Sequence, residues 1–318
     1  MTENHITYYD IIPDIHADAS RLAMTLEALG YRRSDASWEH PDGRLAAFLG
    51  DFIDTGSENR IVIETVRSMV ENGNAVAIMG NHELNALHYH TKGKNRRGVD
   101  DGYMRPHLKD NNDQHETFLE EYPVGGAETQ EVLDWFLTLP LFLDLNTVRL
   151  VHACWDATHI DLLTARRGDG RLLASDLQEI AFEQTDFAKA VVNLLKGPEV
   201  RLPEGYGFDD YKGKWRKKVR IKWWAAPDAT WGEASLSVPA TTVLPEGSIS
   251  SGINTTTYAT EAPPVFFGHY KRPGRPRELD AHNVLCLDYP ETPCAYRWLG
   301  ERNLNLENFV TLGGRAEK

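Results

Sequence analysis

This sequence has few cysteines, no long apolar run and no excess of positive charge. Only three of its 318 residues are cysteines, and they form neither a C-x-x-C pair nor a metal-knuckle pattern. We therefore expect reduced, structural thiols at Cys154, Cys286 and Cys294. No uninterrupted apolar run approaches the length of a membrane span, and the first residues lack the charged and apolar regions of a secretory signal. These absences predict a cytoplasmic protein.

The charge balance is acidic. Lysine and arginine number 34 against 47 aspartates and glutamates, which gives a formal net charge of −13. A nucleic-acid backbone and an anionic membrane both favour a broad basic surface, so neither is an expected main partner. The apolar fraction of 41% and the charged fraction of 25% are those of a globular enzyme.

Short apolar runs that end in polar residues recur along the chain. They are Ile6–Ile12 before PDIH, Leu45–Leu49 before GDFID, Ala75–Met79 before GNHE, Val148–Val151 before HACWD, and Val265–Phe267 before GHY. Such runs are typical of buried strands, and their polar residues are expected in loops at the strand carboxyl ends. Helical patterns lie between the first three runs, one of them with Asp18 as N-cap and Gly30 as stop. The alternation predicts an α/β fold.

The middle of the chain is less regular. Residues 89–122 are polar, and residues 197–264 are rich in Gly, Pro, Ser and Thr. Within the latter, Lys218–Lys222 alternates basic and apolar residues, as a strand with one basic face does. Because motifs lie on both sides, we expect a single domain over 1–318 with 197–264 as an insertion or cap. The last segment, NVLCLDYP followed by AYRWLGE, is expected to form a hairpin.

Two motifs near the amino terminus combine acidic and imidazole side chains. Asp14 and His16 are separated by one residue, so in an extended stretch they point the same way and are able to bind one metal ion. Asp51 and Asp54 follow the second strand in the sequence GDFID. Each pattern alone is weak, since a turn aspartate beside a surface histidine is common.

Three further strand ends carry histidines. Asn81 offers a neutral oxygen to a metal, and His82 beside it is available for proton transfer. His152 and His269 follow the fourth and fifth runs. Individually each is expected to be a hydrogen-bonded core histidine, but five such elements at strand ends argue against coincidence.

The ordered set DIH, GDFID, GNHE, VHA and GHY, across residues 14–269, resembles the calcineurin-like metallophosphoesterase superfamily. The pattern is most similar to the branch of phosphoprotein phosphatases and bacterial dinucleoside tetraphosphatases. The resemblance implies an α/β fold in which a four-layer β-sandwich is flanked by helices. It also implies two divalent metal ions, with manganese expected first and iron, zinc, cobalt or nickel as alternatives.

The resemblance also implies a role for each motif residue. It assigns Asp14 and His16 to the first metal, Asp51 to both metals, Asn81, His152 and His269 to the second metal, His82 as general acid, and Asp54 as the residue that orients His82.

Two departures from the family pattern affect phosphate binding. Thr55 stands where the family commonly has an arginine that grips phosphate, and Met79 stands where an arginine commonly precedes GNHE. Cations expected to replace them are Arg96, Arg97, Arg105, Lys271 and Arg272, with Arg275 and Arg277 nearby. A second candidate is the basic strand, Lys218, Arg220 and Lys222, with Trp215, Trp223 and Trp224 able to stack a base.

The motifs leave three functions open. The first is a phosphatase that hydrolyses phosphomonoesters of small molecules or phosphoproteins by attack of a metal-activated hydroxide. The alternative is a hydrolase of dinucleoside polyphosphates, such as an Ap4A-type nucleotide. The third is a non-catalytic binding protein on the same scaffold. The expected partners are phosphorylated small molecules, nucleotides or phosphoproteins, with no long nucleic acid and no membrane.

Overall fold

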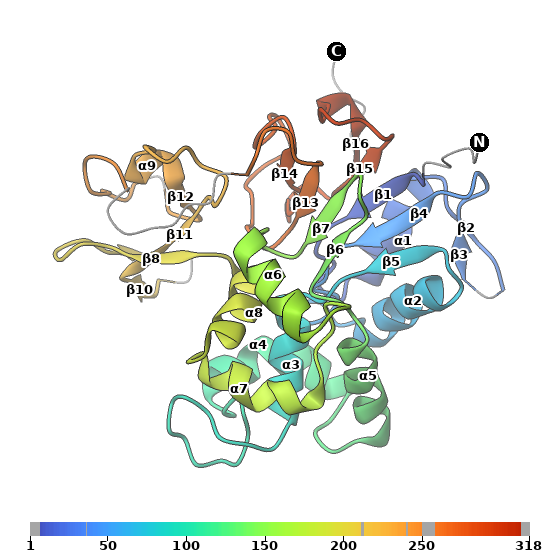
Figure 1. The fold of residues 1–318 in the computed structure, drawn as a ribbon. Coiled ribbons are helices and arrows are strands. Elements are labelled where there is room, and N and C mark those ends of the chain that lie inside the picture. The colour runs from blue at the N-terminus through green and yellow to red at the C-terminus, as the bar shows by residue number, and fades with distance from the viewer. Residues whose placement is uncertain (1–6, 36, 211–212, 240, 250–257, 313–318) are drawn as a thin grey trace.

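Two sheets organise the molecule (Figure 1). The computed structural model describes residues 7–35, 37–210, 213–239, 241–249 and 258–312. The first sheet has the order β16 (Phe309–Thr311), β15 (Cys294–Trp298), β1 (Tyr9–Ile12), β4 (Leu45–Phe48) and β5 (Ala75–Ala77). The second has the order β14 (Val284–Cys286), β13 (Val265–Phe267), β7 (Arg149–Val151) and β6 (Phe142–Asp144). Within them β1, β4 and β5 are parallel, as are β7, β13 and β14.

Successive side chains along a strand point to opposite faces of the sheet, and here the two faces belong to two different apolar cores. Ile11 and Ala47 of the first sheet share a buried cluster with Leu150 and Phe266 of the second, so this core joins the two sheets. Their neighbour Ile12 belongs instead to the larger cluster, which also contains the buried faces of the helices. The observed strands and helices confirm the predicted α/β class.

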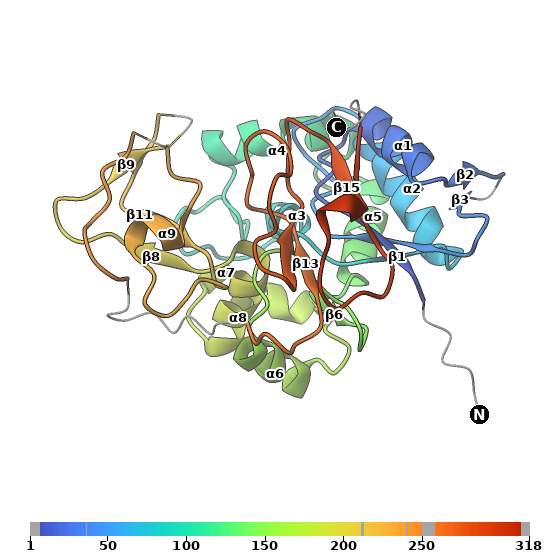
Figure 2. The same cartoon turned by 90° about the horizontal axis from the view of Figure 1, so that it is seen from above.

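Most helices lie around the first sheet and below both sheets (Figures 1 and 2). They are α1 (Ala19–Ala28), α2 (Asn59–Glu71), α3 (Asn81–His90), α4 (Lys109–Glu121), α5 (Ala127–Leu137), α6 (Ala157–Arg166), α7 (Leu177–Phe182), α8 (Asp186–Lys196) and α9 (Trp231–Ala234), with 3₁₀ turns at Ala174–Asp176 and Leu306–Asn308. The predicted cap is present, because the Asp18 side chain accepts a hydrogen bond from the Arg21 amide at the start of α1. Gly30 follows the end of this helix with a φ of +89°.

The described residues between 199 and 249 form small sheets that stand to one side in both views (Figures 1 and 2). The strands are β8 (Glu199–Arg201), β9 (Phe208–Asp209), β10 (Trp215–Arg216), β11 (Lys218–Ile221) and β12 (Ser235–Leu236). The predicted basic strand is β11, with Val219 and Ile221 buried and Lys218 exposed. These strands enclose a small apolar cluster of their own. Tyr211 and Lys212 of the basic run lie outside the described residues.

Two sequence expectations about local structure were wrong, and one helix was not predicted. Asn81 and His82 do not sit in a loop but open helix α3, directly after its N-cap Gly80. The polar segment 89–122 contains the helix α4, whose few buried residues, such as Phe118, give a faint apolar pattern. The expected C-terminal hairpin does not form, because β14 and β15 join different sheets. A short hairpin of β2 (Arg32–Arg33) and β3 (Trp38–Glu39) also lies between the first two long strands.

All three cysteines are free and buried, which agrees with structural thiols. Among the described residues no helix is long and apolar enough to span a membrane.

Candidate active site

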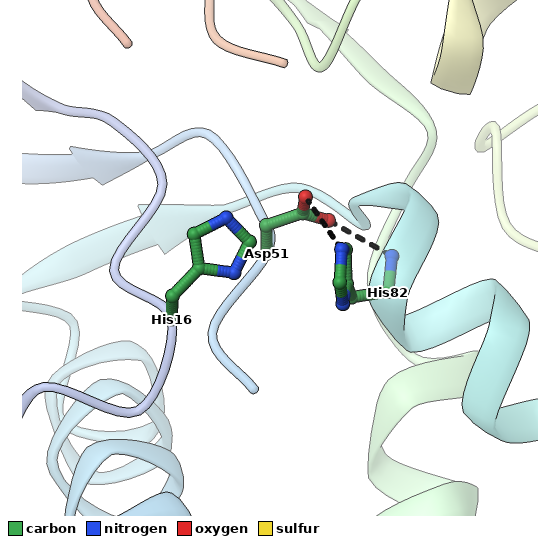
Figure 3. A group of neighbouring side chains, drawn as sticks. All are labelled: His16, Asp51 and His82. Atoms are coloured by element: carbon green, nitrogen blue, oxygen red, sulfur yellow. Dashed lines mark hydrogen bonds and ion pairs between the residues drawn. The ribbon is translucent and has the colours of Figure 1, made fainter. Parts of the chain in front are cut away.

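The carboxyl ends of the strands from both sheets bring the motif residues together. Two groups of potential metal ligands have donor atoms within 4.8 Å of one another. One consists of His16, Asp51 and His82, and the other of Asp51, His152 and His269. Figure 3 shows the Asp51 carboxylate between the His16 ring and the start of α3. Asp51 therefore belongs to both groups, which is the position that the sequence predicted for a bridging carboxylate.

Left-handed backbone conformations are concentrated at this site. His16, Asp51, Asp54 and His269 have φ values of 54°, 52°, 68° and 67°. Such values are uncommon outside glycine and cost free energy, so the surrounding structure must enforce them. The backbone thus turns sharply after several strands and directs polar side chains to one point.

Two motif glycines allow close approach of the loops. A Cβ on Gly80 would lie 2.3 Å from the Asp51 amide nitrogen and from its carboxylate. A Cβ on Gly268 would lie 1.8 Å from the Asp14 carboxylate. Both distances are far below van der Waals contact, so the glycines let neighbouring loops place Asp51 and Asp14 in the site.

His152 converges with oxygen atoms that also accept hydrogen bonds. Its Nδ1 donates to the Leu49 carbonyl at 2.7 Å, which leaves the lone pair on Nε2 in the neutral ring. This Nε2 lies 3.4 Å from Asp51 Oδ1 and 3.1 Å from Asn81 Oδ1. Burial alone would lower the pKa of His152, but Asp51 raises it to about 10. A positive charge is therefore favoured between Nε2 and the two oxygens. A proton on Nε2 supplies it without a metal, and a divalent cation fits the same nitrogen and oxygen donors.

The first group contains an orphaned ring nitrogen. Among the described residues, buried His16 Nε2 and His269 Nε2 have no hydrogen-bond partner. Burial and the neighbouring His82 lower the pKa of His16 to about 4, so its ring is neutral and able to donate a lone pair. An unpaired buried nitrogen is costly, and a metal ion would satisfy it. The nitrogen and oxygen donors therefore fit two divalent ions.

Asp14 lies beside these groups without belonging to either. Its carboxylate accepts the His269 backbone amide at 3.1 Å. Burial, and then the nearby Asp288, raise the pKa of Asp14 well above its usual range. The structure thus brings Asp14 to the site, while His82 and not Asp14 completes the group with His16.

His82 is held by Asp54. Its Nδ1 lies 2.5 Å from Asp54 Oδ2, and the other oxygen of Asp54 is 2.7 Å from His115 Nδ1. Burial alone would raise the pKa of Asp54, but the hydrogen bonds from His115 and His82 hold it at about 2. A charged carboxylate therefore faces both rings.

Three functional residues were missed at the sequence level. Glu83 accepts backbone amides of Gly80, Asp51 and Phe52, so it ties two catalytic loops together. His115 has no recognisable motif around it in the sequence. It lies in the polar segment 89–122, and only the fold brings it to Asp54, 61 positions away. Asp288 had a signal, since it ends the apolar run of NVLCLDYP as Asp14 and Asp51 end theirs. It is 2% exposed, and its Oδ2 has no hydrogen-bond partner among the described residues.

The basic residues that were predicted to bind phosphate lie in different parts of the structure. Arg105 donates to Gln114 at 2.6 Å, and the Gln114 amide nitrogen lies 3.3 Å from His82 Nε2. Burial raises the pKa of Asp288 to about 6, and the charge of Lys271 opposes this rise, which places Lys271 near the centre. Arg272 instead forms an ion pair with Asp280 at 3.4 Å. The remaining candidates, Arg96, Arg97, Arg275 and Arg277, are exposed.

The basic strand contributes less than expected. Trp223 is 3% exposed and donates to the Ala153 carbonyl, so it is a core residue and not a stacking platform. Trp224 is half-buried against Phe267. Trp215 is 56% exposed at β10. Burial, and then the charge of Arg220, hold the pKa of His269 well below its usual range, so Arg220 of this strand lies near the second ligand group.

A family model described as calcineurin-like phosphoesterase matches residues 9–181. This stretch contains β1 to β7, α3 and the members of the two ligand groups other than His269. The chain belongs to the calcineurin-like phosphoesterase family. The predicted resemblance is therefore confirmed. The family implies two divalent metal ions, and the two ligand groups are candidate sites for them.

Relatives within the family carry one recurrent name. A bis(5'-nucleosyl)-tetraphosphatase PrpE [asymmetrical] of Bacillus cereus is 39% identical over 153 residues, which are 46% of this chain and 56% of the relative. A protein of the same name from Halalkalibacterium halodurans is 42% identical over 74 residues, or 23% of this chain and 30% of the relative. The chain thus spans about half or less of these relatives' lengths.

Solved structures support the fold. The cold-active protein-tyrosine phosphatase of a psychrophilic Shewanella species has a TM-score of 0.52, with 13% identity, 97% of this chain covered and 81% of that chain. At this identity the similarity concerns the fold alone.

Proposed function

We propose that this protein is a metal-dependent phosphoric ester hydrolase. The observation that carries the proposal is the position of Asp51, which is shared by two groups of ligand atoms. As the family resemblance implies, we assign Asp14, which lies beside the first group, with His16 and Asp51 to one ion. Asp51, Asn81, His152 and His269 would hold the other, with manganese as the first metal to test. Two divalent ions held there would supply an activated water and neutralise charge on the phosphoryl group.

The side chains of the chain divide the remaining tasks. His82, with Nδ1 on Asp54, is placed to give a proton to the oxygen of the leaving group. Burial alone would lower the pKa of His82, whereas Asp51 and Asp54 hold it above its usual range, so that the acid form is available near neutral pH. Asp54 acts through His82 and is a positioning residue.

We propose dinucleoside polyphosphates as the leading substrate class. The sequence placed phosphomonoesters first and these nucleotides second. The relatives' names favour the second reading, because the regions in common with Bacillus cereus and Halalkalibacterium halodurans proteins belong to tetraphosphatases. The absence of the family arginine at Thr55 supports the same order, since a site without it needs other cations for phosphate.

One panel tests the proposal. The manganese-loaded protein is assayed by kcat/KM on p-nitrophenyl phosphate, a phosphopeptide, a dinucleoside tetraphosphate and a phosphodiester. We expect hydrolysis that a chelator abolishes and that Asp51→Asn reduces by roughly a hundredfold or more. The control is Asp186→Asn, at an exposed carboxylate far along the chain. No activity above that of His82→Ala on any substrate would favour the non-catalytic binding protein instead.

The architecture around the site is part of the proposal. We propose that the two sheets and their outer helices form the four layers implied by the family, within one domain over 1–318. The 197–264 region, with its own small core, would act as the cap. Because Trp223 of this region belongs to the main core, the test replaces an exposed cap residue and does not delete the region. Trp215→Ala should change kcat/KM on the larger substrates of the panel more than kcat/KM on p-nitrophenyl phosphate.

A further inference from the structure

A pocket beside the reaction site is lined by four basic side chains. Its volume is about 270 Å³, and it lies among α3, α4, α7, α8 and the segment that joins α3 to α4. The basic residues are Arg96, Arg97, Arg105 and Lys196. Glu183 is the one acidic residue in the lining, so the pocket has a clear excess of positive charge.

Part of this charge has no neutralising partner in the lining. Arg96 forms an ion pair with Glu183. Arg105 donates to the neutral Gln114, and its buried Nε has no partner among the described residues. Burial lowers the pKa of Arg105 to about 10, with Asp54 opposing the shift and Arg97 adding to it. Burial also lowers the pKa of Lys196, with Glu183 opposing the shift and Arg105 and Arg96 adding to it. Cations that lose hydration and repel one another in one pocket are costly, and a bound anion would offset that cost.

The pocket adjoins the residue that we assign as the proton donor. Gln114 accepts from Arg105 on the pocket side, and its amide nitrogen faces His82 Nε2 at 3.3 Å. Asn85, one turn along α3 from His82, also lines the pocket. An anion held there is therefore close to the leaving-group side of the reaction.

The residues that line the pocket fit a phosphate group better than a stacked nucleobase. None of the described lining residues is a phenylalanine, tyrosine or tryptophan, and the polar ones include Asn85, Asn95 and Asn111. The volume lies at or below the lower end of about 300–1,000 Å³ that is usual for small-molecule sites. Arginine forks and amide groups in a small space fit phosphate oxygens, whereas a stacked purine would need a flat aromatic wall.

We propose that this pocket binds the phosphate chain that extends beyond the phosphoryl group to be cleaved. The inference rests on the proposed function and narrows it to substrates with several linked phosphates. The cations would hold the departing part of the chain while His82 protonates its bridging oxygen. Free inorganic polyphosphate and a dinucleoside polyphosphate share this chemistry, so the test includes both.

The test measures inhibition of p-nitrophenyl phosphate hydrolysis by inorganic tripolyphosphate and by inorganic phosphate. We expect the wild-type protein to bind tripolyphosphate more tightly than inorganic phosphate. The ratio of the two inhibition constants should change roughly tenfold toward equal binding in Arg97→Gln and in Lys196→Met. Arg97 is exposed, so its variant is not expected to impair folding. Lys189→Met on the same helix is the control, because Lys189 is exposed, pairs with Asp186 and does not line the pocket.

Each outcome decides the question. An unchanged preference in both variants overturns the proposal. In the same variants kcat/KM on a dinucleoside tetraphosphate should fall together with the preference for tripolyphosphate. If only tripolyphosphate binding weakens, the pocket holds free polyphosphate and the substrate assignment is wrong. If the wild-type protein hydrolyses nothing, the proposed function fails, and calorimetric titration of tripolyphosphate into wild type and Arg97→Gln still tests the pocket by itself.

Discussion

Asp54 Oδ2 and His82 Nδ1 lie 2.5 Å apart at the edge of the two ligand groups. The same carboxylate accepts from His115, so one buried aspartate fixes the ring of a residue on α3 and the ring of a residue on α4. The pair requires a proton on His82 Nδ1 and leaves Nε2 to face the site. This relationship gives the first prediction.

Changing Asp54→Asn should lower kcat more strongly for poor leaving groups than for good ones. Without the carboxylate the pKa of His82 falls, so less of its acid form is present, and the ring loses the partner that orients it. General acid catalysis contributes roughly 10²–10⁴-fold. The measurement compares p-nitrophenyl phosphate with an alkyl phosphate at equal metal content. An equal loss on both substrates would mean that Asp54 supports the fold or the metals and not the proton transfer.

Gly80→Ala should displace Asp51 and destabilise the protein. The new Cβ would lie 2.3 Å from the Asp51 amide nitrogen, so the GDFID and GNHE loops must separate. Overpacking of this kind costs about 1–3 kcal/mol in the free energy of unfolding. Chemical denaturation checks the loss, and Gly168→Ala is the control because nothing lies within 4 Å of its Cβ position. Equal stability of the two variants would contradict the close packing of these loops.

Acid should destabilise the fold partly through His88. Burial lowers its pKa to about 3, and its Nε2 donates to the Leu177 carbonyl at 3.1 Å. Since the unfolded chain titrates near 6.5, it binds more protons than the folded chain between pH 6.5 and pH 3, and stability is lost as the pH falls through that window.

For His88 the loss approaches about 1.4 kcal/mol per pH unit, or about 2 kcal/mol at pH 5. His88→Gln should flatten the fall in the free energy of unfolding between pH 7 and pH 5. His282→Gln, at an exposed histidine, should leave the slope as it is in the wild type. A slope that His88→Gln does not alter would show that other groups cause the acid sensitivity.

Arg44→Met should be strongly destabilising. Arg44 donates to both oxygens of Asp10, at 2.8 and 3.0 Å, and to the Trp298 carbonyl, inside the first sheet. Asp10 is fully buried, so removing the guanidinium leaves a charge that Arg297 alone must compensate. The expected cost is about 3–5 kcal/mol.

The control for this ion pair is Arg67→Met, which breaks an exposed pair with Glu71 on α2. Surface pairs contribute about 0–1 kcal/mol, so this variant should unfold nearly as the wild type does. Similar midpoints for both variants in a denaturant titration would disprove the central role of the buried pair.

The local sequence pattern was sufficient to predict many of the strands and the start of the first helix. The runs before PDIH, GDFID, GNHE, HACWD and GHY are strands or their continuations, and Asp18 caps its helix as predicted. These features depend on period-2 burial and on short-range capping, both of which are written in neighbouring residues. The same runs indicated which side chains stand at strand ends.

Contacts between distant segments could not be derived in this way. Asp54 meets His115 across 61 positions, and Asn81 meets His269 across 188, because helix packing and strand order bring them together. NVLCLDYP was expected to pair with AYRWLGE, yet the two strands entered different sheets and left Asp288 beside Asp14. Trp223 looked like a stacking surface until tertiary packing buried it.

The sequence by itself determined the α/β class and the family, and it proposed the residues that carry the chemistry. A site with imidazole and carboxylate ligands needs no cysteine, which agrees with the small number of cysteines. Only the tertiary structure decided which of these residues share Asp51 and which cations gather in the pocket beside His82. The physical reason is that ligand distances and uncompensated charge depend on how loops far apart in the chain pack together, and no local pattern encodes that packing.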